Sequence, residues 1–138
     1  MSKADIQRQF DYAVNQVLKQ GKPAGNSIVG CKYRTKANGG KVLKCPVGWL
    51  IPDSYFKKHP EDIANIPVAL LDPSVYSYTR MKPFVGTKKL LVELQYAHDD
   101  AAELYSTQPK KFCSNFWHKA RDIAAAYGLA WNFNFARI

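Results

Sequence analysis

Apolar side chains recur every three or four positions in two segments of the C-terminal half, and this spacing constrains the fold more than any other feature of the chain. One segment begins after Thr87, a candidate N-cap, and its stripe holds Leu90, Leu91, Leu94, His98, Ala101 and Tyr105. The other lies between Pro109 and Gly128, and its stripe holds Phe112, Cys113, Phe116, Trp117, Ala120, Ile123, Ala124 and Tyr127. Such spacing places apolar residues on one face of a helix. We therefore expect a pair of helices packed around a shared core.

A third amphipathic helix is predicted at the start of the chain, from Ala4 to about Gln20. Its apolar positions are Ile6, Phe10, Ala13 or Val14, Val17 and Leu18, and Gly21 follows as a stop signal. The chain has 138 residues, and 46% of them are hydrophobic, which suits one domain with its own core. We expect residues 1–138 to form a single domain.

A β-hairpin is predicted between the first helix and the helical pair. Its β-like runs, Ser27–Thr35 and Lys41–Cys45, flank a loop whose Asn38, Gly39 and Gly40 tolerate positive φ. In the expected register Tyr33 lies opposite Leu43 and Cys31 opposite Cys45. Alternation along each strand then puts the following residues on one face: Val29, Cys31, Tyr33, Leu43 and Cys45.

The other face of this hairpin would hold Lys32 beside Lys44, with Arg34 next to them. Like charges on adjacent strands destabilise a sheet. Two arrangements relieve them: the side chains splay into water, which costs less, or an anionic partner lies between them.

Prolines divide the middle of the chain into short elements. Pro46 stands at a first helical position and Pro52 ends the segment, which predicts a single buried helical turn. Asp53 is a candidate cap for a helix over residues 54–58, and Pro60 opens a short helix to Asn65. Residues 66–86, with three further prolines, allow no assignment.

The tail alternates apolar and polar residues at Trp131-Asn132-Phe133-Asn134-Phe135, as a half-buried strand does. It is a candidate third strand beside the hairpin. The fold class predicted from these patterns is α+β: a mainly helical single domain with a small antiparallel β-hairpin.

Charge is the feature most informative about partners. The formal net charge is +9, and no acidic residue occurs from Tyr12 to Pro52. The hairpin supplies the candidate binding residues Lys32, Arg34, Lys36, Lys41 and Lys44. Such a basic surface attracts nucleic acid, with salt-sensitive affinity, or a protein with an acidic surface. Trp131, Phe133 and Phe135 can stack on bases, but alternating aromatic residues more often face a core.

A thiol-dependent or hydrolytic enzyme is the alternative from another class. Cys45 stands at the start of a predicted helical turn, where free N–H groups and Lys44 favour a thiolate, and His98 with Asp99 supplies a base and its orienting carboxylate. The competing interpretation makes Cys45 a small core residue and His98 a hydrogen-bonded histidine on an apolar stripe. Because no family-specific signature surrounds Cys45, we favour the core interpretation and assign no catalytic residue.

Neither a metal nor a cofactor is predicted. The possible ligands lack the close spacing of zinc sites: Cys31, Cys45, Cys113, His59, His98 and His118. The phosphate-binding patterns G-x-x-x-x-G-K-[ST] and G-x-G-x-x-G do not occur in the sequence. Three cysteines make an odd number, which disfavours a disulfide framework.

Two segments carry a resemblance: Cys31-Lys32-Tyr33-Arg34, and Lys44-Cys45-Pro46-Val47-Gly48-Trp49-Leu50-Ile51-Pro52-Asp53. Together they resemble a Cys-x-Tyr-Arg, Lys-Cys-x-Val-Gly-x-Leu-Ile-Pro-Asp pattern in small proteins of phages and prophages. The C-terminal helical part, with Leu90-Leu91 and His98-Asp99, is similar too, although the hairpin loop is longer here and a proline-rich insert precedes Phe84. The resemblance implies a phage-type accessory protein and supplies no catalytic residues.

We therefore expect a non-enzymatic binding protein, with inhibition of a host process as one form of that role and a virion structural component as a further alternative. The beginning of the chain, Met1-Ser2-Lys3-Ala4-Asp5, is followed by no apolar stretch of the secretory kind, and no segment has the length and hydrophobicity of a membrane span. The expected location is the cytoplasm, that of the host cell if a phage encodes the protein.

Overall fold

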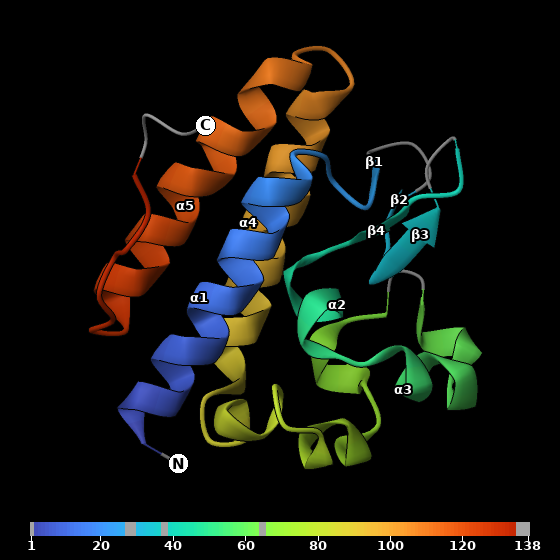
Figure 1. The fold of residues 1–138 in the computed structure, drawn as a ribbon, viewed down its shortest axis with the longest axis vertical. Helices are drawn as coiled ribbons and strands as arrows, with labels where there is room; N and C mark the ends of the chain where they lie inside the picture. Colours follow the sequence, from blue (N-terminus) through green and yellow to red (C-terminus); the bar gives the residue numbers. More distant parts are fainter. Residues whose placement is uncertain (1, 27–29, 37–38, 64–65, 135–138) are drawn as a thin grey trace.

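Three long helices form the main layer of the molecule: α1 (Lys3–Gln20), α4 (Lys88–Tyr105) and α5 (Phe112–Ala126) (Figure 1). The computed structural model describes residues 2–26, 30–36, 39–63 and 66–134. All three predicted helices are confirmed. Pro109 opens a 3-10 turn, Pro109–Lys111, that leads directly into α5.

The ends of α1 follow from local chemistry. The Ser2 hydroxyl accepts a hydrogen bond from the Asp5 N–H at 3.3 Å, and Asp5 adds a negative charge at the first turn. Gly21 ends the helix with a φ of 72°, a left-handed conformation in which its N–H bonds to the Val17 carbonyl. The apolar stripes of the three helices are buried together, with Phe10, Leu94 and Phe116 fully enclosed.

Two short helices pack beside this layer. α2 (Pro46–Leu50) contacts both α1 and α4 from one side, and α3 (Asp53–Lys58) follows at once (Figure 1). The predicted single turn after Pro46 is confirmed. The prediction that Asp53 caps α3 is wrong. Pro52, whose ring fixes its φ, occupies the N-cap, and Asp53 is the first helical residue.

The proline-rich middle of the chain forms 3-10 turns rather than α-helices. They are η1 (Pro60–Ile63), η2 (Val68–Leu70), η3 (Pro73–Ser77) and η4 (Lys82–Phe84). Each is short because prolines interrupt the backbone hydrogen bonds. η2 and η4 contact α4, whereas η1 contacts α3 and η3 contacts η4. Val75, Met81 and Phe84 are buried in this part of the chain.

The predicted hairpin is present, with a register that differs from the expected one. β3 (Arg34–Lys36) pairs antiparallel with β4 (Val42–Lys44), and Arg34 lies opposite Lys44 while Thr35 lies opposite Leu43. The expected pairing of Tyr33 with Leu43 is therefore wrong by two residues. Within β3 and β4, a slip of two keeps the side chains on their predicted faces, and Leu43 is accordingly buried.

The register differs because the chain bends at Tyr33. The Tyr33 N–H donates to the Ile63 carbonyl at 2.8 Å, and the Tyr33 carbonyl accepts from the Cys45 N–H. Before this bend, β1 (Gly25–Asn26) and β2 (Gly30–Cys31) form a separate pair in which Cys31 lies opposite Gly25. The expected pairing of Cys31 with Cys45 is therefore wrong, and Val29 of the predicted inner face lies outside the described residues.

The predicted third strand is also wrong. Residues 129–134 join neither sheet. Instead, the Gln7 side chain of α1 satisfies the backbone of Ala130, accepting from its N–H at 2.8 Å and donating to its carbonyl at 3.0 Å. Trp131 packs edge-on against Phe10 and Trp117, which confirms the core-facing interpretation for this residue. Phe135 lies outside the described residues.

Within the part of the chain that the structure describes, no helix combines the length and the hydrophobicity that crossing a bilayer requires.

Candidate functional site

The five predicted hairpin cations lie in three places. Arg34 and Lys44 are directly opposite each other on β3 and β4, and their side chains are only 28% and 16% exposed. Lys36 and Lys41 are exposed at the loop end of the hairpin. Lys32 lies before the bend at Tyr33, at the edge of a pocket beside α4. The hairpin therefore does not present one continuous basic face.

A carboxylate of the same chain relieves the repulsion between Arg34 and Lys44. Asp53 Oδ1, at the start of α3, lies 3.2 Å from Arg34 Nε and 3.4 Å from Lys44 Nζ. The anion between the like charges is thus intramolecular, and neither splaying into water nor an external partner is needed. Two cations share one carboxylate, so a positive charge is left over at this end of the hairpin.

Lys44 also faces a cleft that the sequence did not reveal. The cleft has a volume of about 360 Å³ and is lined by Tyr12, Lys44, Trp49, Leu50, Ile51, Pro52, Tyr78, Thr79 and Arg80. We call it the Trp49 cleft. Its walls come from α1, from the end of β4 with α2, and from the segment before η4. None of the described residues that line it is acidic.

Each cation of the Trp49 cleft lies against an aromatic ring. Lys44 Nζ is 5.0 Å from the centre of the Trp49 ring, and Arg80 Cζ is 3.5 Å from the centre of the Tyr12 ring. Cation–π contacts of this kind hold a charge in place without neutralising it.

The guanidinium of Arg80 is fixed by a second contact. Arg80 Nη1 donates to Gln9 Oε1 at 3.0 Å, and Gln9 is buried in α1. A guanidinium has five N–H donors. Among the described residues Gln9 alone accepts from them, so the exposed guanidinium keeps donors that no other described residue uses.

This arrangement suits a ligand that carries both negative charge and a flat ring. Lys44 and Arg80 offer donors for phosphate oxygens, and an unpaired base can stack on Trp49 or on the guanidinium plane of Arg80. Sequence reasoning missed Tyr12, Trp49, Tyr78 and Arg80. The acid-free run from Pro73 to Val92 contains Arg80 and was the one available signal, but only the fold brings it to Lys44.

The candidate nucleophile Cys45 is completely buried. Its Sγ accepts a hydrogen bond from the Gly48 N–H at 3.3 Å and thereby caps α2. The helix N-terminus favours a thiolate as expected, but burial outweighs it and raises the pKa of the Cys45 thiol to about 12. Cys45 is therefore a protonated structural thiol at neutral pH.

His98 and Asp99 do not serve Cys45 as a base and its orienting group. His98 is fully buried, and its Nε2 accepts the Ala24 N–H at 3.1 Å, which places the proton of a neutral ring on Nδ1. Nδ1 lies 2.9 Å from Asp99 Oδ1. Since both ring nitrogens are engaged, His98 links α4 to the segment before β1 and has no free nitrogen for proton abstraction.

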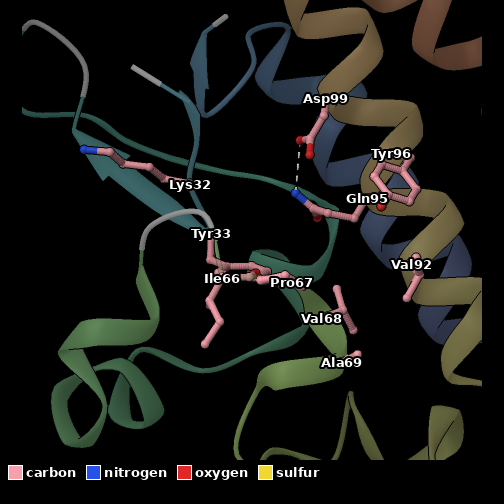
Figure 2. A pocket seen from close by; sticks show the side chains of 10 residues that line it. All are labelled: Lys32, Tyr33, Ile66, Pro67, Val68, Ala69, Val92, Gln95, Tyr96 and Asp99. Atoms are coloured by element: carbon pink, nitrogen blue, oxygen red, sulfur yellow. Dashed lines mark hydrogen bonds between the residues drawn. The ribbon is translucent and has the colours of Figure 1, made fainter. Parts of the chain in front are cut away.

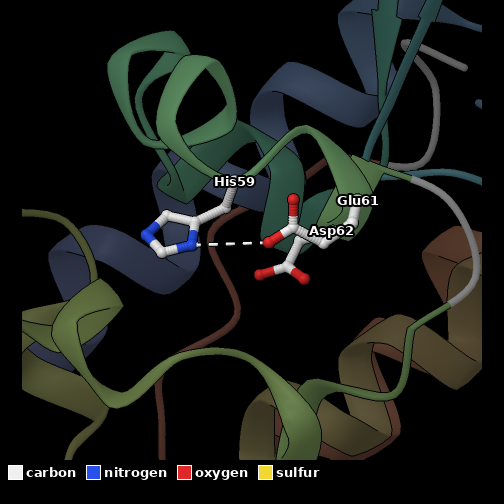
Figure 3. Close-up of side chains that lie close together, drawn as sticks. All are labelled: His59, Glu61 and Asp62. Atoms are coloured by element: carbon white, nitrogen blue, oxygen red, sulfur yellow. Dashed lines mark ion pairs between the residues drawn. The ribbon is translucent and has the colours of Figure 1, made fainter.

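Of the possible metal ligands, His59 alone joins a cluster in the described part of the chain. Ligand atoms of His59, Glu61 and Asp62 lie within 4.8 Å of one another (Figure 3). The Asp62 carboxylate already accepts the Tyr55 hydroxyl at 2.6 Å, and Glu61 is mostly exposed. Three ligand atoms are fewer than the four of a structural zinc site, so we assign no metal here.

Comparisons of the chain with protein-family models, with curated proteins and with solved structures found no match. The phage-type resemblance stays a prediction, and the function is argued from the geometry of the chain.

Proposed function

We propose that this protein is a non-enzymatic binding protein that contacts single-stranded nucleic acid through the Trp49 cleft. The observation that carries the proposal is the pairing of each cleft cation with an aromatic ring, Lys44 with Trp49 and Arg80 with Tyr12. Sites that combine phosphate-binding cations with stacking platforms are typical of single-strand binding proteins.

Single strands fit this cleft better than duplexes do. A base must leave the duplex stack before it can lie on an aromatic ring or on a guanidinium plane. In the proposed complex, phosphates contact Lys44 and the free donors of Arg80, while a base lies on the outer face of the Arg80 guanidinium. The Tyr12 ring supports that guanidinium from the opposite side.

The hairpin extends the proposed contact surface beyond the cleft. Lys36 and Lys41 are exposed and have no ion pair among the described residues. They belong to the same hairpin as Lys44, so a strand held in the cleft can run along them. Such contacts are independent of base sequence and weaken as salt rises.

Fluorescence anisotropy with a labelled oligothymidylate of about 20 nucleotides tests the proposal. We expect Arg80→Ala and Trp49→Ala each to weaken binding by about tenfold, because each removes a phosphate contact or a stacking platform. Lys110→Ala is the matched control: Lys110 is an exposed lysine in the turn before α5, and its loss is expected to leave the affinity unchanged. Circular dichroism of each variant establishes that it folds.

Equal binding by Arg80→Ala, Trp49→Ala and the parent protein would contradict the proposal. An acidic protein surface is the other partner that the charge pattern predicts. Polyglutamate, which has negative charge but no rings, is the probe for it. Polyglutamate bound as tightly as oligothymidylate would show that charge alone is recognised.

A further inference from the structure

A second cavity lies between α4, η2 and the bend at Tyr33 (Figure 2). Its volume is about 300 Å³, within the range of small-molecule pockets. Most of its lining is apolar and comes from Ile66, Pro67, Val68, Ala69, Val92 and Tyr96. Its polar lining residues are Lys32, Tyr33, Gln95 and Asp99. We call it the Asp99 pocket.

Two neighbours hold the Asp99 carboxylate in a fixed position. Its Oδ1 accepts from Gln95 Nε2 at 3.3 Å, the bond drawn in Figure 2, and lies 2.9 Å from the Nδ1 of buried His98. Since both donors act on Oδ1, Oδ2 has no hydrogen-bond or ion-pair partner among the described residues. A preorganised acceptor of this kind binds a donor at little further ordering cost.

Among the described residues, no lysine or arginine neutralises Asp99. Lys32 lines the pocket, but Figure 2 shows its side chain running away from Asp99, and the two form no ion pair. The His98 ring carries no charge in this arrangement, because its Nε2 accepts the Ala24 N–H and so holds no proton. A negative charge therefore stands at the wall of a largely apolar cavity, in a chain whose net charge is +9.

We propose that the Asp99 pocket binds a small primary amine with an apolar body. The ammonium would donate to Asp99 Oδ2, a charge-assisted hydrogen bond of the strong kind. The apolar body would lie against Val68 and Val92. The exposed ring of Tyr96 stands at the rim and adds a face that attracts cations.

Nuclear magnetic resonance titration with 2-phenylethylammonium tests this assignment, with 2-phenylethanol as a neutral probe of nearly equal shape. We expect the ammonium to bind with a Kd near or below about 1 mM and to shift the amide signals of Val92 and Gln95. The alcohol should bind about tenfold more weakly, since it lacks the charge.

Two variants test whether the probes bind in the Asp99 pocket. Asp99→Asn should weaken 2-phenylethylammonium about tenfold and change 2-phenylethanol less, because it removes the charge and replaces the free acceptor oxygen with an NH2 group. Ala69→Phe adds a ring at an exposed lining position and should abolish binding of both probes.

Three results would overturn the proposal: no shifts at the pocket, equal affinities for the two probes, or an Asp99→Asn affinity equal to that of the parent. N-acetyl-lysinamide represents a lysine side chain of a partner protein. Tighter binding of this probe than of 2-phenylethylammonium would assign the pocket to a lysine of a protein partner and would overturn the proposal of a small-molecule ligand.

Discussion

Gly48 shows how one residue fixes the junction between the hairpin and the helices. A Cβ at this position would lie 1.9 Å from the Tyr33 carbonyl oxygen, a backbone atom that the Cys45 N–H also holds. The close approach allows the hairpin to meet the first turn of α2, where Cys45 and Lys44 are positioned. Glycine is required there for space rather than for its conformational freedom.

We predict that Gly48→Ala lowers the free energy of unfolding by about 3 kcal/mol, because backbone must move to admit the methyl group. Gly86→Ala is the matched control: no atom lies within 4 Å of the added Cβ, and its φ is not positive. Its expected effect is neutral or a gain of up to about 1 kcal/mol. Urea denaturation measures both. Equal effects of the two substitutions would show that the contact at Gly48 is not limiting.

Cys45 gives a second prediction at the scale of one residue. Because burial raises its thiol pKa to about 12, we expect iodoacetamide to leave Cys45 unmodified in the native protein at pH 8 and to modify it readily in urea. Mass spectrometry of the Cys45 peptide provides the measurement. Native-state modification at the rate of a free thiol would restore the enzyme hypothesis.

The hairpin and α3 depend on each other through Asp53. Its carboxylate is half exposed, so solvent screens its contacts with Arg34 and Lys44. The same carboxylate competes with any external anion for these two cations. It therefore stabilises the fold slightly and weakens the proposed binding.

Asp53→Asn is predicted to act in opposite directions on these two properties. Stability should fall by at most about 1 kcal/mol, since exposed pairs contribute little. The affinity for oligothymidylate should rise about twofold to threefold, because the cations are freed. Denaturation and anisotropy on the same preparation measure the two effects. An unchanged affinity in the folded variant would mean that the cations freed from Asp53 do not contact the nucleic acid.

Elements with a regular period could be predicted from the sequence, and those held by single contacts could not. The apolar stripes of α1, α4 and α5 repeat over many residues, so the prediction of each helix does not depend on any single position. The hairpin register depends on the Tyr33 N–H finding the Ile63 carbonyl, 30 residues away, and no local pattern encodes that contact. The tail alternates like a strand, but Gln7 satisfies its backbone.

At the scale of the whole molecule, one thiol and three phenol groups determine how stability changes at high pH. Burial raises the pKa of Cys45 to about 12. Desolvation, together with the Glu93 carboxylate, raises the pKa of Tyr127 to about 12. Burial also raises the pKa values of Tyr33 and Tyr55. In the unfolded chain these groups ionise at their ordinary, lower pKa values. The native state then binds more protons than the unfolded state, so stability falls as pH rises.

We predict a falling midpoint of urea denaturation between about pH 9 and about pH 11, with the full contribution of these groups retained below that range. Cys45→Ala removes one of them and should reduce the slope. A midpoint that stays constant over this range would contradict the raised pKa values of these groups.

The candidate site could be predicted only in part, since its residues come from three distant stretches. Lys44 was among the cations expected on the hairpin. Trp49 was part of a short element, and Arg80 lay in a stretch with no assignment. Packing of α2 against α1 brings Tyr12 and Trp49 to one cleft, and the turn before η4 adds Arg80. Charge patterning predicts an anionic partner, whereas tertiary packing assembles the cleft that we propose binds it.

The salt dependence of oligothymidylate binding tests the central claim most directly. For the parent protein we expect log Kd to rise linearly with log salt, as release of counterions from phosphate contacts requires. The double variant Lys44→Ala, Arg80→Ala should lose two such contacts and lower the slope by about 1.4. An unchanged slope in this variant, or a parent affinity that salt does not affect, would contradict phosphate binding in the Trp49 cleft.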